Sequence, residues 1–123
     1  MSGLITRRKL HENTAGDAEL ADEVLGIFLE QVDLWGKMLN AKDEPSRWAD
    51  AAHTIKGAAL GIGAEQLADA CKVAEQAGRS DEPPSATKAA VLLNDIRDCL
   101  MPTLDEVAKI RHEISVSGSF RAS

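Results

Sequence analysis

The chain has 123 residues, of which 44% are hydrophobic, and its net charge is −6. This length suits one domain with a single core. The abundance of Ala and Leu, with only two Trp, two Phe and no Tyr, favours helices over sheets. No apolar run reaches the length of a membrane helix, the first residues lack the order of a secretory signal, and the acidic balance argues against nucleic acid as a partner. Cys71 and Cys99 have no CxxC spacing, so we expect neither a zinc site nor disulfides, and a cytoplasmic location.

The first half of the chain predicts a short helix followed by a long one. Thr6 is expected to cap a turn of helix through Glu12, with Leu10 as its apolar contact. Asp17 is expected to begin a helix over residues 17–40, because acidic residues crowd its first turns, where the helix dipole favours negative charge. Its apolar stripe is predicted to comprise Leu20, Val24, Ile27, Phe28, Gln31, Trp35, Met38 and Leu39.

Three more helices complete a predicted bundle. One begins near residues 44–46, where Pro45 suits a first helical turn, and ends at residues 61–63; the next covers residues 64–78. The last covers residues 86–114, and Pro102 inside it should kink it or split it in two. Residues 115–123 are polar and small, and we expect a disordered tail. The pattern therefore predicts an all-α fold, an up-and-down antiparallel four-helix bundle with a short N-terminal helix, as one domain over residues 1–114.

His53 lies on the wrong face of the second long helix for a core residue. Its position is nearly opposite the apolar stripe that begins at Trp48, so either a solvated or a functional histidine is expected. The same outer face is predicted to hold Ala49, Lys56, Gly57 and Leu60. A helical glycine costs about 1 kcal/mol relative to alanine. Close approach of a partner would explain Gly57, and helix flexibility is the alternative.

Lys56 is expected to influence the chemistry of His53. Three residues after His53, it is a neighbour on the helix surface. Its charge disfavours imidazolium, which keeps the ring nucleophilic, and would stabilise a phosphoryl group placed on that ring. Nucleophilic histidines that form covalent intermediates are established chemistry.

The segment from Ala52 to Leu67 resembles the signature of histidine phosphotransfer (HPt) domains. That signature has His, then Lys at +3, Gly at +4, Gly at +10 and Leu at +14. The matching residues are His53, Lys56, Gly57, Gly63 and Leu67. Gly16-Asp17 followed by residues 27–30 is similar to the opening helix of the family, and Glu75, at +22, occupies a position where the family often has Gln or Glu. The resemblance covers about residues 6–112.

The resemblance implies a monomeric phosphorelay protein of bacterial two-component signalling, without kinase activity. His53 would be the phosphoacceptor, and the partners would be response-regulator receiver domains and a hybrid sensor histidine kinase. No metal or cofactor is expected, because the Mg²⁺ used in transfer belongs to the receiver domain. Lys56 would stabilise the phosphoryl group and Glu75 could orient the ring, although an ordinary surface carboxylate is an equal alternative. The residues expected to dock the partner are Ala49, Gly57 and Leu60.

Two other functions remain open. A non-catalytic helical adaptor would dock a receiver or kinase through the face from Ala49 to Leu60 without accepting phosphate. A cofactor-binding bundle is disfavoured, because the inward positions offer no convergent ligands. His11 and His112 lie far from the motif and are expected on the surface.

Overall fold

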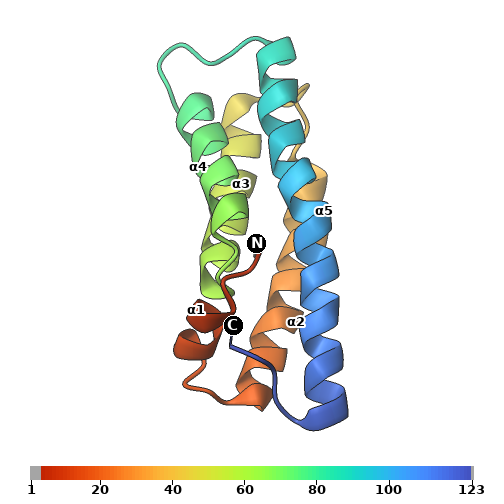
Figure 1. Cartoon of the computed structure of the whole chain (residues 1–123). Helices are drawn as coiled ribbons and strands as arrows, with labels where there is room; N and C mark the ends of the chain where they lie inside the picture. The colour runs from red at the N-terminus through yellow and green to blue at the C-terminus, as the bar shows by residue number, and fades with distance from the viewer. Residues whose placement is uncertain (1–3, 123) are drawn as a thin grey trace.

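The computed structural model describes residues 4–122, and within them every regular element is a helix. The elements are α1 (Arg7–Asn13), α2 (Ala18–Trp35), the 3₁₀ helix η1 (Gly36–Met38), α3 (Pro45–Gly61), α4 (Glu65–Gly78) and α5 (Ala86–Ser117). The four long helices run up and down beside one another, and α1 lies across one end (Figure 1). The predicted all-α four-helix bundle with a short N-terminal helix is confirmed. None of the helices in this part of the chain has the length and apolar character needed to cross a membrane.

Each helix turns its apolar stripe into one shared core. Phe28 of α2, Trp48 and Ile55 of α3, Leu67 of α4 and Ile96 of α5 are all fully buried there. A single amphipathic helix of this length is marginal in water, so packing of the four stripes supplies most of the stability. Asp17 begins α2 as predicted, because its side chain accepts a hydrogen bond from the backbone of Leu20 at 3.1 Å.

The predicted stripe of α2 was partly wrong. Leu20, Ile27 and Met38 were expected in the core, yet all three are exposed. The α-helix also stops at Trp35 and continues only as the short η1, rather than running to residue 40. Apolar residues spaced three and four positions apart in the sequence predicted a stripe that was too wide. Only the residues at the centre of that stripe face the other helices.

Helices α3 and α4 form the most closely packed pair of the bundle. Gly78, the last residue of α4, lies so near α3 that a Cβ atom there would be 2.7 Å from Trp48 Cζ3 and 2.9 Å from Ala49 Cβ. Ala49 is consequently fully buried. Its expected place on the exposed docking face is therefore wrong, because α4 covers that flank of α3.

Pro102 was expected to kink the last helix or split it in two, and the split is excluded because α5 is continuous through Pro102. Proline removes one backbone donor, and buried neighbours on both sides, Leu100 and Thr103, hold the helix against the core. The Thr103 hydroxyl also donates to the Cys99 carbonyl at 2.7 Å.

The prediction of a domain ending at residue 114 and a disordered tail is wrong for residues 115–122. Helix α5 extends to Ser117 and ends at Gly118, whose φ of +74° suits a helix C-terminus. The chain then turns back, and Phe120 is buried against His11 with ring centroids 5.8 Å apart. The backbone N–H of Arg121 donates to the Glu113 carboxylate at 3.2 Å. The segment is otherwise small and polar in composition, so the sequence did not reveal that its one aromatic side chain, Phe120, anchors it.

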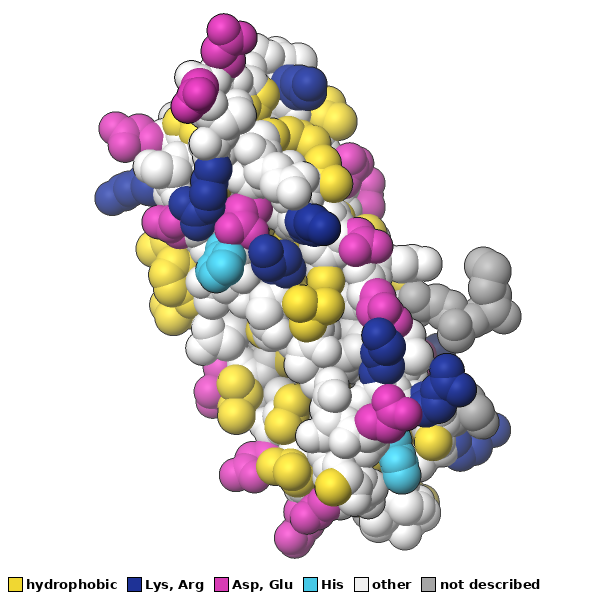
Figure 2. Space-filling model, turned by 90° about the vertical axis from the view of Figure 1, so that its left-hand side faces the viewer, with side chains coloured by type: hydrophobic (Ala, Val, Ile, Leu, Met, Phe, Trp, Pro, Cys, Tyr) yellow, Lys and Arg dark blue, Asp and Glu magenta, His cyan; other side chains and the backbone are white. Residues whose placement is uncertain are grey.

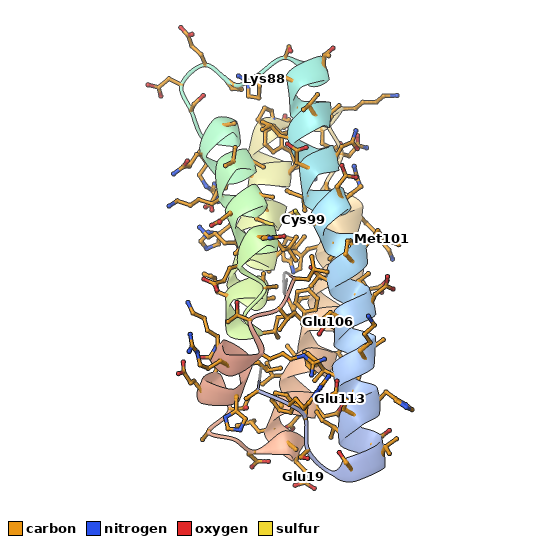
Figure 3. The ribbon with its side chains drawn as sticks, in the orientation of Figure 1. Glu19, Lys88, Cys99, Met101, Glu106 and Glu113 are labelled. Atoms are coloured by element: carbon orange, nitrogen blue, oxygen red, sulfur yellow. The ribbon has the colours of Figure 1, made fainter. Side chains whose placement is uncertain are left out.

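Helix α1 closes the end of the bundle where α3 turns into α4. Thr6 precedes the helix as predicted, but its hydroxyl donates to Glu65 at 2.9 Å instead of capping α1. Its backbone N–H donates to the Gly63 carbonyl at 2.8 Å. Arg7 pairs with Glu106 and Glu113, which project from α5 toward α1 (Figure 3), at 2.9 and 2.8 Å. The segment that begins α1 thus connects the α3–α4 turn to α5.

This geometry predicts opposite effects for alanine at two motif glycines. Gly63 has φ of +79°, and a Cβ there would lie 2.7 Å from the Thr6 carbonyl oxygen. Gly63→Ala should therefore lower the free energy of unfolding by about 2 kcal/mol or more. Gly57 lies within α3 with nothing within 4 Å of its Cβ position, so Gly57→Ala should raise stability by about 0.5–1 kcal/mol. Urea unfolding of both variants measures this, and equal effects would contradict it.

Candidate functional site

An exposed histidine on α3 marks the candidate site. The register that buries Ile55 leaves His53 on the outside, with 60% of its side chain exposed. Its Nδ1 lies 2.8 Å from Oε2 of Glu75, which projects from the neighbouring α4. Figure 2 looks onto this side of the bundle and shows acidic and basic side chains gathered around a histidine. The histidine is therefore held by one nitrogen and open to solvent.

Glu75 connects the charged groups of the site. Besides His53, its carboxylate accepts from Lys56 Nζ at 2.7 Å and from Arg79 Nε at 3.2 Å. Only 13% of the Glu75 side chain is exposed. This burial alone would raise the pKa of Glu75, but the hydrogen bonds from Lys56, Arg79 and His53 outweigh it and lower the pKa to about 2. The carboxylate is accordingly ionised at neutral pH.

The ionised carboxylate fixes the tautomer of His53. A carboxylate can only accept hydrogen bonds, so Nδ1 must carry the hydrogen and donate it to Glu75. In the neutral ring, Nε2 then holds the free lone pair. No hydrogen bond from residues 4–122 engages Nε2. In that neutral form, the ring presents one unprotonated nitrogen to an incoming group.

Two residues of the site were missed by sequence reasoning. Arg79, which directly follows α4, donates to Glu75 one turn earlier, and its Nη2 pairs with Asp50 Oδ1 of α3 at 2.9 Å. The i, i+4 spacing of Glu75 and Arg79 was the available signal. Asp50 precedes His53 by one turn, but only the packing of α3 against α4 brings its carboxylate to Arg79.

The other residues singled out in the sequence divide into three groups. Lys56 contacts Glu75, so its expected influence on His53 passes through that carboxylate. Gly57 and Leu60 are exposed beside the site, as expected, whereas Ala49 is buried beneath α4 and offers no docking surface. His112 is exposed, but His11 is half-buried between Gly16 and Phe120 rather than on the surface.

Within residues 4–122, neither a metal site nor a reactive cysteine is found. Among residues 4–122, no three His, Cys, Asp or Glu side chains gather in a way that could hold a metal ion. Burial raises the pKa of the Cys71 thiol to about 12, so it stays protonated and unreactive. Cys99, labelled in Figure 3, is half-buried, and burial raises its pKa as well.

Comparisons with known proteins found one matching family model and a similar solved structure. The family model described as Hpt domain matches residues 19–107, which include every site residue described above. The crystal structure of histidine phosphotransferase ShpA from Caulobacter crescentus is similar to the chain, with 35% sequence identity and a TM-score of 0.66. The match covers 89% of this chain and 91% of that one. The comparison with curated proteins gave no match.

The depressed pKa of Glu75 predicts how the network contributes to stability. The ordinary glutamate pKa is 4.5 and the folded value is about 2, so the contribution is complete above pH 4.5 and is lost as the pH falls toward 2. The difference in unfolding free energy between the parent and Glu75→Gln should therefore be largest at neutral pH and shrink on acidification. Urea unfolding at several pH values measures it. A difference that is constant or grows toward pH 2 would contradict the assignment.

Proposed function

Since the chain belongs to the Hpt domain family, we propose that it relays phosphoryl groups between aspartates of receiver domains through a phosphohistidine at His53. It acts as a monomer in the cytoplasm, without kinase activity or a cofactor of its own. A hybrid sensor histidine kinase and response regulators supply and receive the phosphoryl group, and the Mg²⁺ used in transfer resides in the receiver domain. The observation that carries this proposal is the exposed ring of His53, tied through Nδ1 to the ionised Glu75.

Loading of His53 needs no proton transfer on this chain. The Nε2 lone pair attacks the phosphorus of an aspartyl phosphate, the N–P bond forms, and the P–O bond breaks with its electron pair leaving on the aspartate. Nδ1 keeps its hydrogen, so the ring becomes positively charged. Glu75, 2.8 Å from Nδ1, stabilises that charge as it develops. Transfer to the next aspartate reverses these steps and leaves a neutral imidazole.

The two cations at Glu75 would stabilise the phosphoryl oxygens. Lys56 and Arg79 are held by the carboxylate in the free protein, at 2.7 and 3.2 Å. A dianionic phosphoryl group on Nε2 competes for the same donors, and a flexible lysine can reorient at small cost. Phosphoryl transfer depends chiefly on such positioning and charge stabilisation. Arg79 is restrained further by Asp50, so Lys56 is the principal phosphoryl contact.

Replacing the acceptor tests the proposal directly. His53→Gln should stay folded, because the side chain is mostly exposed, and should take up no acid-labile phosphate from a phosphorylated receiver domain. His112→Gln, also at an exposed position of the chain, is the matched control and should load as the parent does. Labelling with ³²P and hydroxylamine sensitivity are the measurements. Continued labelling of His53→Gln would contradict the proposal. Receiver binding without any labelling of the parent would instead identify an adaptor.

Gly57 should separate transfer from stability. Its Cβ position meets nothing within 4 Å, so a side chain there fits the free protein and improves helix propensity. It would, however, protrude one turn from His53 into the space where a receiver must approach. Gly57→Gln should therefore equal or exceed the parent in stability and transfer at least about tenfold more slowly, since misplacement by an ångström costs orders of magnitude. Urea unfolding and transfer kinetics check both outcomes, and loss of stability together with activity would indicate a packing role.

A further inference from the structure

We propose that Asp50 is a positioning residue for the phosphotransfer reaction, which holds Arg79 away from the phosphoryl group and so limits how far His53 is phosphorylated at equilibrium. The inference rests on the proposed function and adds to it a residue that neither accepts nor contacts the phosphoryl group. It follows from the different partners of the two cations at the site and from the single partner of the Asp50 carboxylate within residues 4–122.

Arg79 is held between the carboxylates of two helices. Its Nη2 lies 2.9 Å from Oδ1 of Asp50 on α3, and its Nε lies 3.2 Å from Oε2 of Glu75 on α4. Because a guanidinium is planar and its nitrogens are fixed relative to one another, two such contacts determine both its position and its plane. The pKa of Arg79 is raised, chiefly by the hydrogen bond to Asp50 and then by the one to Glu75. The shorter distance and the larger effect on the pKa both make Asp50 the stronger restraint.

Lys56, in contrast, has a single carboxylate partner. Among residues 4–122, its Nζ donates only to Oε1 of Glu75, at 2.7 Å. A lysine ammonium is a point charge on a flexible stem, so it can turn from Glu75 toward a neighbouring phosphoryl oxygen. Two cations therefore contact the same carboxylate beside His53, and only one of them is free to leave it. Asp50 is the residue that makes this difference.

Phosphorylation would place the phosphoryl group in competition with Asp50 for Arg79. Nε of Arg79 and Nδ1 of His53 contact the same oxygen of Glu75, so the guanidinium lies within reach of a group on the ring. When the N–P bond to Nε2 forms and the P–O bond of the aspartyl phosphate breaks, the negative charge of the phosphoryl oxygens is transferred to this chain. Arg79 can turn to that charge only by giving up its contact with Asp50. An interaction that must be lost on phosphorylation shifts the equilibrium toward the unphosphorylated form.

The side chain of Asp50 has no other contact that a substitution would disturb. It is 60% exposed, and among residues 4–122 its carboxylate has no partner besides Arg79. The hydrogen bond that Thr54 donates at 3.2 Å goes to the backbone carbonyl of Asp50, which a substitution leaves in place. An exposed ion pair contributes little to the stability of a fold. Removing the carboxylate should therefore release Arg79 and leave α3 intact.

The experiment measures the equilibrium of phosphoryl exchange between this chain and a receiver domain. The probe is the phosphorylated receiver domain that loads the parent chain fastest in a profile of receivers from the source organism. The partition of ³²P between the two purified proteins gives the equilibrium constant. Asp50→Asn should raise that constant toward phosphohistidine about two- to fivefold, the range that loss of an exposed ion pair allows. The constant relates the free proteins, so a docking role for Asp50 would leave it unchanged.

A double-mutant cycle tests whether Asp50 acts through Arg79. In an Arg79→Gln background, Asp50→Asn should change the constant by less than about 1.5-fold, because the side chain that it would release is gone. Asp105→Asn removes an exposed carboxylate of α5 and is the control for net charge. It should stay within about 1.5-fold of the parent. Urea unfolding should show that every variant is folded.

Three results would overturn the inference while the proposed function stands. If Asp50→Asn leaves the constant unchanged or lowers it, Asp50 does not oppose phosphorylation. A gain that is equally large in the Arg79→Gln background would mean that the carboxylate repels the phosphoryl group directly. The same gain in Asp105→Asn would make it an effect of net charge. If no receiver domain labels the parent chain, the proposed function itself fails.

Discussion

The carboxylate of Glu75 is the contact on which the site depends. It accepts hydrogen bonds from two residues of α3, His53 and Lys56, and from Arg79, the residue that follows its own helix. One side chain thereby fixes a tautomer, restrains two cations and joins two helices. The arrangement works only because three donors keep the carboxylate ionised despite its burial, since an unpaired acid in that position would raise its pKa and protonate. A protonated Glu75 would no longer determine which nitrogen of the ring is free.

Close packing of α3 and α4 makes that contact possible. Gly78 and Ala49 bring the two backbones together near one end of the pair, and Gly63 makes the tight turn at the other. Larger side chains at these positions would separate the helices, and a short glutamate could not reach across the gap. The small side chains of the alanines and glycines in this region therefore allow the two helices to approach closely, in addition to their effect on helix propensity. Gly57 and Gly61 are exceptions, because no neighbour in the described chain lies within 4 Å of their Cβ positions.

The sequence predicted the helices and the central site residues because both follow local rules. Capping, proline placement and periodicity located each helix to within a few residues, and the spacing of His53 and Lys56 put both on α3. What it missed depends on which helix lies beside which. Ala49 and His53 share a face of an isolated helix, and only the presence of α4 buries one and leaves the other exposed. Arg79 was missed for the same reason, as was the fold-back of Phe120 onto His11.

The charges of the side chains around His53 cancel one another. Lys56 and Arg79 carry two positive charges, and Glu75 and Asp50 carry two negative ones, so the network has no excess cation to attract a phosphate group from a distance. A site of this kind stabilises a phosphoryl group after the group is bonded to the ring, when its negative charge lies beside Lys56. Before that bond forms, the site has little means of distinguishing one phosphorylated partner from another. Recognition of a partner must therefore come from surface outside this charged network. Under the proposed function, the α4 side of the histidine serves the phosphoryl chemistry.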